Sequence, residues 1–340
     1  MSVMFAAINW RKNGIMKVEI SNSMKIVDFT RKLVPEAAGL AYAAYERERR
    51  FVPALPRIDA VPELDSFADT GLGVAAVRDG QVIGFLCGCE PFDNAFGSTD
   101  VRGIFSPMGA NAAIEDDRSF IYAAMYQEAA KKWVREGAVS HALCLYAHDE
   151  ELQQQFFRYG FGMRCVDAIR LTRQIDCNPC MDYSFEELAG DEIYAVYPLF
   201  LLMHDHFCKS PFFMNRTPDT PEALIESCTE GKDRMFVAKH KNKICAFAGI
   251  TATGETFIAA GRGYHHLNGA YCLPEHRGKG VYQNLLHFIL SVLSAEGDVR
   301  LGVDFESINP NAWGFWRKYF EAYTYGVVRR IDERIIKMKE

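Results

Sequence analysis

A short glycine-rich loop between an apolar run and an amphipathic run holds the residues best suited to bind an anion. The loop reads Arg277-Gly278-Lys279-Gly280-Val281-Tyr282. Glycine lets a backbone approach a ligand closely, and the N–H groups at a helix N-terminus favour negative charge. Arg277 and Lys279 add charge-assisted hydrogen bonds. The loop therefore predicts a cradle for a pyrophosphate group.

A second segment further along the chain has residue types that suit the other side of such a ligand. It reads Asn309-Pro310-Asn311-Ala312-Trp313-Gly314-Phe315-Trp316-Arg317-Lys318-Tyr319-Phe320. Asn309 is a helix-capping residue type that can also bond to ligand amides, and Ala312 is small enough to allow close approach. Without a ligand, Phe315 and Trp316 would be core residues. The two segments together predict one binding region.

The elements that must position these segments occur twice along the chain. The matching pairs are two β-hairpins (74–85 and 236–247), two long amphipathic helices (119–136 and 281–296), two apolar strands (141–146 and 299–305) and two short helices that carry Phe156-Phe157 and Phe315-Trp316. The helices follow the helical apolar spacing, and glycines Gly137 and Gly297 follow them as usual C-terminal caps. Offsets near 160 residues indicate one unit used twice.

These residues resemble the GCN5-related N-acetyltransferase (GNAT) family. Arg277 to Gly280 match that family's (Gln/Arg)-x-x-Gly-x-(Gly/Ala) acetyl-CoA loop, except that Tyr282 stands at the last position. Asn309, Ala312 and Trp316 fall in the family's second conserved segment. The resemblance covers 177–340, and over 25–176 it holds for the order of the pattern.

The resemblance implies acetyl-CoA bound in a V-shaped opening between two splayed parallel strands. Pantetheine would run along 270–273, and the backbone N–H of Cys272 or Leu273 would polarise the thioester carbonyl. The pyrophosphate would lie on the N–H groups from Gly278 to Tyr282, including those of Lys279 and Val281. An amine would then attack the thioester directly, with a base to take its proton and an acid to protonate the thiolate.

The proton-transfer groups depart from the family pattern. Most members carry an acidic Tyr where this chain has Trp316, so Tyr319, one helical turn further on, is the predicted substitute. Asp304 and Glu306 face one side of their strand, and Glu306, expected nearer the cleft, is the predicted base. The alternatives are Glu275, His265 and His266.

The first copy lacks the loop. Its counterpart, 104–119, has no Arg-Gly-Lys-Gly, and Glu115-Asp116-Asp117 would repel a pyrophosphate. Asp149 stands near the place of Asn309, where a helix N-cap is the simpler interpretation. The first copy is therefore predicted to be a degenerate unit that supports the second, shapes the acceptor cleft or binds a different ligand.

The predicted fold class is α/β, with two tandem GNAT-like domains that each have a central mixed β-sheet flanked by helices. We expect an extension at 1–24, a degenerate domain at 25–176 and a domain with the acetyl-CoA loop at 177–340. The boundary follows from the turn-rich linker 176–182.

Composition narrows the classes of function. The chain has 340 residues, 49% hydrophobic and 24% charged, with a net charge of −6, which is typical of a globular protein and gives no support to a nucleic-acid partner. Ten scattered cysteines predict free thiols in a reducing, cytoplasmic setting, and the lone Cys177-x-x-Cys180 pair lacks the further ligands of a metal site. No apolar run predicts a membrane span.

The leading hypothesis is an acetyl-CoA-dependent N-acetyltransferase that acts on a primary amine of a small molecule or peptide through the C-terminal unit. The alternative is a non-catalytic module that binds CoA or another metabolite. A third is transfer to a protein N-terminus or an aminoacyl acceptor. The segment 207–216 and the partner unit are expected to contact the acceptor, and the tandem is expected to be a monomeric pseudo-dimer or a homodimer.

Overall fold

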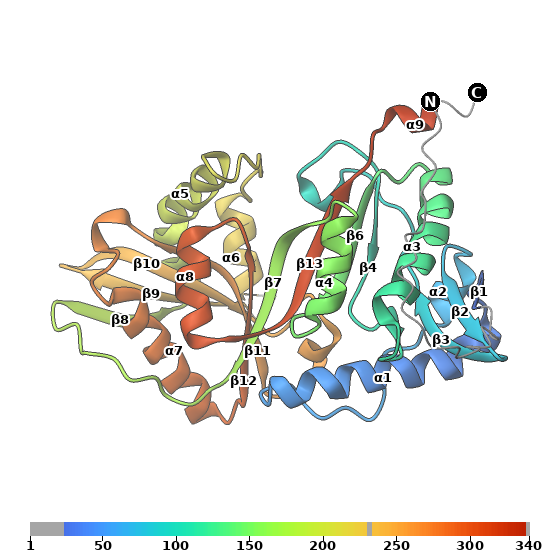
Figure 1. Ribbon diagram of the computed structural model, residues 1–340. Coiled ribbons are helices and arrows are strands. Elements are labelled where there is room, and N and C mark those ends of the chain that lie inside the picture. The colour runs from blue at the N-terminus through green and yellow to red at the C-terminus, as the bar shows by residue number, and fades with distance from the viewer. Residues whose placement is uncertain (1–23, 230–232, 338–340) are drawn as a thin grey trace, which may run out of the picture.

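The computed structural model describes residues 24–229 and 233–337, in which helices pack on a mixed nine-stranded sheet and an antiparallel four-stranded sheet (Figure 1). The predicted α/β class with mixed sheets flanked by helices is confirmed. Residues 1–23 of the predicted extension lie outside the described residues.

The N-terminal half begins with a short strand and two helices. It then follows the predicted order of hairpin, strand, helix, strand, helix and strand, except that the strand after the hairpin is divided into two. Its elements are β1 (Lys25–Asp28), α1 (Val34–Phe51), α2 (Asp65–Asp69), β2 (Val74–Arg78), β3 (Gln81–Leu86), β4 (Gly103–Ser106), β5 (Asn111–Ala113), α3 (Arg118–Arg135), β6 (Ser140–Tyr146), α4 (Glu150–Arg158) and β7 (Gly162–Leu171).

The C-terminal half repeats this order, with a single strand in place of β4 and β5, and adds a short helix at its end. Its elements are β8 (Tyr183–Leu188), α5 (Tyr197–Cys208), α6 (Pro221–Thr229), β9 (Arg234–His240), β10 (Lys243–Thr251), β11 (Tyr264–Cys272), α7 (Val281–Glu296), β12 (Arg300–Glu306), α8 (Pro310–Tyr319), β13 (Glu321–Arg330) and α9 (Arg334–Lys337).

The predicted long helices are confirmed within a residue of their expected ends. Gly137 and Gly297 follow them with φ of +82° and +89°, the left-handed conformation that ends a helix at low cost when the residue is glycine. A second glycine pair, Gly109 and Gly269, also lies 160 residues apart, with φ of +87° and +92°. The repeat is therefore visible in the backbone conformation as well as in the order of elements.

The two halves share one sheet. A nine-stranded sheet has the order β4-β6-β13-β7-β12-β11-β10-β9-β8, while β1, β2, β3 and β5 form a separate four-stranded sheet. The last strand of each half crosses over: β7 pairs with β12, and β13 pairs with both β6 and β7. In Figure 1, the red β13 accordingly lies among the green strands of the N-terminal half.

Helices cover both faces of the C-terminal part of this sheet. Leu285 and Ile289 of α7 pack with Leu301 and Val303 of β12 on one face. On the opposite face, α5 and the turn before it pack on Phe247 and Tyr271. No helix in the described ranges is long and apolar enough to cross a membrane.

Candidate functional site

The predicted anion loop connects β11 to the N-terminus of α7. Gly278 and Gly280 have φ of +73° and +77°, a conformation that strains any residue with a Cβ. Gly280 is the N-cap of α7 and supplies no side chain to bond the first-turn N–H groups. Those groups and the positive end of the helix dipole are therefore available to an anion.

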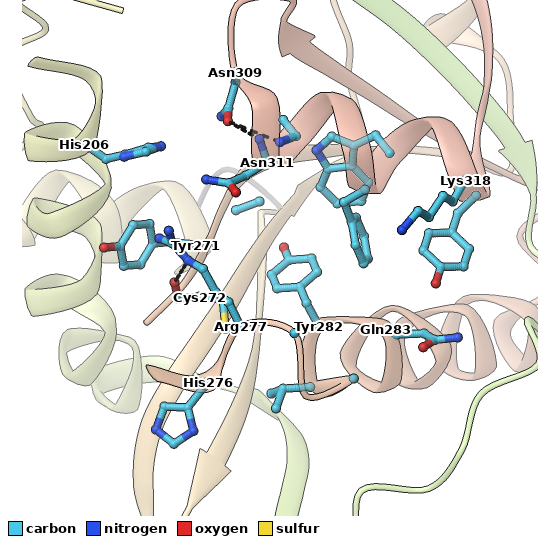
Figure 2. Close-up of a pocket in the computed structure, with 18 residues that line it drawn as sticks. His206, Tyr271, Cys272, His276, Arg277, Tyr282, Gln283, Asn309, Asn311 and Lys318 are labelled. Atoms are coloured by element: carbon cyan, nitrogen blue, oxygen red, sulfur yellow. Dashed lines mark hydrogen bonds between the residues drawn. The ribbon is translucent and has the colours of Figure 1, made fainter. Parts of the chain in front are cut away.

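Arg277 fixes the loop to the end of β11. Its Nε donates a 2.8 Å hydrogen bond to the carbonyl oxygen of Cys272 (Figure 2), and its guanidinium lies 5.2 Å from the centre of the Tyr271 ring. The charged group is thereby held at the edge of the binding region, where it can meet a phosphate oxygen.

The strands next to the loop separate as the resemblance implies. β11 and β12 are parallel and pair from Tyr264–Arg300 to Leu267–Val303, after which β11 continues to Cys272 without pairing to β12. The Leu273 N–H already donates to the carbonyl of Cys245 at 2.9 Å. Because N–H directions alternate along a strand, the Cys272 N–H points into the gap, so Cys272 is the better placed of the two predicted carbonyl partners.

The helix α8 forms the opposite wall. The Asn309 side chain caps it by accepting bonds from the N–H groups of Asn311 and Ala312 at 3.1 and 3.2 Å (Figure 2). Trp316 is 5% exposed, and its ring meets that of Tyr282 edge-on at 5.8 Å between centres. Ala312 leaves the space in front of these rings open.

These walls enclose a cavity of about 410 Å³, a size within the range of small-molecule sites. It is lined by His206, Ala270, Tyr271, Cys272, His276, Arg277, Gly278, Gly280, Val281, Tyr282, Gln283, Asn309, Asn311, Ala312, Phe315, Trp316, Lys318 and Tyr319. Of the predicted site residues, Leu273, Lys279 and Glu306 lie outside this lining. The two segments predicted from the sequence therefore both line the cavity, and the fold brings them together.

Tyr282 occupies the position where the family motif has a small residue. Its hydroxyl donates to the carbonyl oxygen of Phe247 at 3.1 Å, and burial raises its pKa well above the usual value. The phenol stands inside the cavity in Figure 2. It therefore narrows the space beside β11 and keeps its proton.

Tyr319, the predicted acid, lines the cavity from the last turn of α8. Its ring packs on Phe315 with centres 4.9 Å apart, and burial raises its pKa. The phenol therefore carries a proton at neutral pH, as an acid must. Its role stays a prediction.

Glu306, the predicted base, is engaged in two ion pairs. Its carboxylate lies 2.6 Å from Nη2 of Arg216 and 3.4 Å from Nε of Arg164. Only 11% of its side chain is exposed. This arrangement favours a structural carboxylate that holds Arg216, from the expected acceptor segment, against the sheet.

The alternative bases lie in different places. Glu275 is exposed in the loop before α7. His265 pairs with Asp298 at 2.8 Å, at the end of β11 away from the gap. His266 is 3% exposed and bonds through Nε2 to Oδ1 of Asp304 at 2.7 Å.

His206 is a cavity residue that the sequence reasoning did not place there. It extends from α5 toward the cavity (Figure 2), and burial and the nearby Arg277 guanidinium lower its pKa. Its only signal in the sequence was a histidine in an apolar helix, which is more often a packing residue than a site residue. Contact between α5 and β11 is what brings it to the site.

The cysteine pair of the linker contacts the anion loop and α7. Cys180 donates to the carbonyl of Lys279 at 3.2 Å, and both Cys177 and Cys180 contact the side chain of Asn284. All ten cysteines lie in the described part of the chain and are free thiols. Within that part, no group of three His, Cys, Asp or Glu side chains is placed to hold a metal ion.

The equivalent place in the N-terminal half is filled by its own side chains. Arg118, 160 residues before Gly278, donates to Asp149 at 2.6 Å. Asp149 also caps α4 through the N–H of Leu152, which confirms its interpretation as an N-cap. Tyr122, near the start of α3, donates to the buried Asn111 at 2.9 Å.

Comparisons with known proteins agree with this geometry. The model of the Acetyltransferase (GNAT) family matches residues 200–321, the segment that contains the anion loop and Asn309. No curated protein sequence matches the chain.

Two solved structures share the fold. A GCN5-related N-acetyltransferase from Sphaerobacter thermophilus superposes with a TM-score of 0.53 at 12% identity, over 90% of this chain and 95% of that one. The GCN5-related glucosamine N-acetyltransferase region of a fungal multi-domain GH3 β-N-acetylglucosaminidase gives 0.50 at 12% identity, over 91% of this chain and 38% of the fungal one. The predicted resemblance of this chain to the GNAT family is thereby confirmed.

Proposed function

We propose that this protein is an acetyl-CoA-dependent N-acetyltransferase that acts on a primary amine of a small molecule or peptide. We also propose the division into a supporting unit at 25–176 and a catalytic unit at 177–340. One observation carries the proposal: a single cavity joins the uncapped N-terminus of α7 to the end of β11 that no longer pairs with β12. The cytoplasmic setting and the choice between monomer and homodimer stay predictions.

The cosubstrate would be held at two points. The pyrophosphate would meet the N–H groups from Gly278 to Tyr282 and the guanidinium of Arg277. The pantetheine would lie beside β11, with Ala312 and Asn309 opposite. Lys279 lies outside the cavity lining, and from there its positive charge would attract the pyrophosphate.

The chain's own groups suit acyl transfer. The Cys272 N–H, which points into the gap, would bond to the thioester oxygen and stabilise the negative charge that develops there. Tyr319 keeps its proton and would supply it to the departing thiolate. Glu306 would hold Arg216 in place beside the incoming amine.

A non-catalytic CoA-binding module is the second candidate. Two observations favour it: Trp316 replaces the family's acidic Tyr, and Tyr282 narrows the cavity beside β11. Such a module would bind acetyl-CoA without releasing free thiol in the presence of any amine.

The test is acetyl-CoA binding by calorimetry followed by thiol release with a panel of diamines, amino sugars and peptides. Gly280→Asp places a negative charge at the helix N-terminus and is expected to abolish both signals. Gly39→Asp is the matched control, because Gly39 is exposed in α1 with open space around it. Binding without thiol release would support the second candidate.

A further inference from the structure

We propose that Asp304 is the residue that takes the proton from the acceptor amine, and that His266 is the positioning residue that orients the Asp304 carboxylate. This inference rests on the proposed acetyltransferase function and deepens it. The structural feature behind it is the point where β11 and β12 stop pairing.

Asp304 is the first residue of β12 beyond the last pair that joins the two strands. That pair is Leu267–Val303. Val303 and Phe305 pack on the α7 side of the sheet, so the intervening Asp304 side chain points to the opposite face. An amine that approaches the gap from that face meets Asp304 at the apex of the opening.

The carboxylate is held from behind by a buried pair. His266 bonds through Nε2 to Oδ1 of Asp304 at 2.7 Å and through Nδ1 to the Tyr264 hydroxyl at 3.0 Å. Burial raises the pKa of Tyr264, so its phenol keeps its hydrogen and donates it to Nδ1. Nε2 then carries the imidazole hydrogen and donates it to Asp304, as in other His–carboxylate pairs.

Exposure distinguishes the roles of the two residues. His266 has only 4% of its side chain exposed, whereas Asp304 has 34%. Oδ1 of Asp304 is fixed by the imidazole, and Oδ2 makes no hydrogen bond to the described residues. Asp304 can therefore contact a substrate, while His266 acts through Asp304.

Gly302 makes room for this pair. A Cβ at position 302 would lie 2.9 Å from Nδ1 of His266 and would overlap the Tyr264 hydroxyl. Both side chains therefore lie directly over the backbone of β12. A larger residue at 302 would displace them from Asp304.

Charged groups crowd the same face. Burial, with a further contribution from Asp304, raises the pKa of Asp167 to about 7 and also raises the pKa of Glu255. The titratable and charged groups around Asp304 come from β7, β11, β12 and the loops that follow β10 and α5: Cys165, Asp167, Tyr264, His266, Glu306, Glu255 and Arg216, with Arg164 paired to Glu306. The excess of carboxyl groups suits an ammonium ion that arrives protonated.

Glu306 and His206 are the two other candidates for the base, and both are less well placed than Asp304. Glu306 is committed to Arg216 and Arg164. His206 lies near Arg277, at the end of the cavity that the pyrophosphate loop forms. Asp304 is the carboxylate at the apex itself.

The step balances as follows. Asp304 takes one proton from R–NH₃⁺, and the nitrogen lone pair of R–NH₂ forms a bond to the acetyl carbon. The C–S bond then breaks, and the thiolate takes the second nitrogen proton, directly or through Tyr319. The products are R–NH–CO–CH₃ and CoA–SH, and the proton on Asp304 is released to solvent.

The experiment uses the full chain, an amine that the wild type acetylates, and steady-state thiol release from pH 5 to 9. Asp304→Asn is expected to lower kcat about 100-fold, a typical loss for a general base, with the KM for acetyl-CoA within about 3-fold of wild type. His266→Leu removes the N–H donor and is expected to lower kcat without raising the KM for acetyl-CoA, because the Asp304 carboxylate is no longer held toward the amine. His266→Gln retains a donor and is expected to restore kcat at least in part.

The matched control is His265→Gln, which disrupts the neighbouring His–Asp pair at the far end of β11 and leaves kcat unchanged. Thermal unfolding and acetyl-CoA binding by each variant show whether it is folded, and Asp304→Glu provides a conservative second variant. The inference is overturned if Asp304→Asn keeps more than half of kcat, or if His266→Leu and His265→Gln act alike. A wild type that binds acetyl-CoA but acetylates no amine overturns the proposed function instead, and this inference with it.

Discussion

Arg118 donates a 2.6 Å hydrogen bond to Asp149 between the N-termini of α3 and α4, at the place that the cavity of the C-terminal half occupies between α7 and α8. Within the N-terminal half, the Arg118 guanidinium therefore already makes a charged contact. In the C-terminal half, the corresponding contact is left open for a ligand. Tyr122 and Asn111 fill the adjoining space between β5 and β6. The two halves share a backbone design and differ in whether its cavity is filled.

The first prediction concerns stoichiometry. Because the N-terminal equivalent is filled, calorimetry is expected to give one acetyl-CoA per chain. Gly280→Asp is expected to remove all binding, since the negative side chain lies at the N-terminus of α7. Two molecules per chain, or residual binding in the variant, would show that the N-terminal half also takes the cosubstrate.

The second prediction concerns the acid. Tyr319→Phe removes the phenolic proton from the cavity and is expected to lower kcat about 100-fold, with little change in acetyl-CoA affinity. Tyr42→Phe, on the outer part of α1 and 38% exposed, is the control. A kcat equal to that of wild type would assign the proton to solvent or to the amine itself.

The third prediction concerns pH and stability. Burial raises the pKa of Asp167 to about 7 from an ordinary 3.8, so between these values the folded chain keeps a proton that the unfolded chain has lost. Below about pH 4, Asp167 therefore does not lower the free energy of unfolding. As the pH rises from about 4 to about 7, Asp167 lowers that free energy progressively. The loss is about 1.4 kcal/mol for each unit by which the folded-state pKa exceeds the unfolded-state pKa.

Urea unfolding at pH 5 and pH 8 measures this effect. Asp167→Asn is expected to gain stability relative to wild type as pH rises, by up to a few kcal/mol. Asp59→Asn, at an exposed position, is the control and gains nothing. An equal pH dependence in wild type and Asp167→Asn would mean that Asp167 titrates normally in the folded chain.

The fourth prediction concerns the strand exchange. Since β7 lies between β12 and β13, and β13 between β7 and β6, fragments 24–176 and 177–340 each lack a strand from the middle of their sheet. Each fragment expressed alone is expected to be insoluble or unfolded by circular dichroism, and co-expression is expected to restore a folded complex. A 177–340 fragment that folds alone and binds acetyl-CoA would contradict this account.

Much of the fold followed from local sequence patterns. The apolar spacing of 281–296 matches α7 at both ends, because one stripe of that helix packs on the sheet. The hairpins were equally visible as two strand-forming runs around turn residues. The crossover of β7 and β13 was not, because an apolar strand carries no local signal that specifies its neighbour.

The residues of the candidate site also divide into those that local sequence patterns predicted and those that they could not predict. The loop at 277–282 and the segment at 309–319 were recognisable because glycines, capping residues and charges stand at fixed spacings. His206 and the Asp304–His266 pair depend on contacts between distant elements. Glu306 also illustrates this: its position in β12 was correctly inferred, but Arg216 and Arg164, which engage it, come from separate parts of the chain.

The most direct test of the central claim is amine-dependent thiol release from acetyl-CoA by the full chain, with Gly280→Asp and Gly39→Asp measured in parallel. The account predicts stoichiometric release of CoA and acetylated amine by wild type and Gly39→Asp, and none by Gly280→Asp. Acetyl-CoA binding without release across the amine panel, or release that persists in Gly280→Asp, would contradict it.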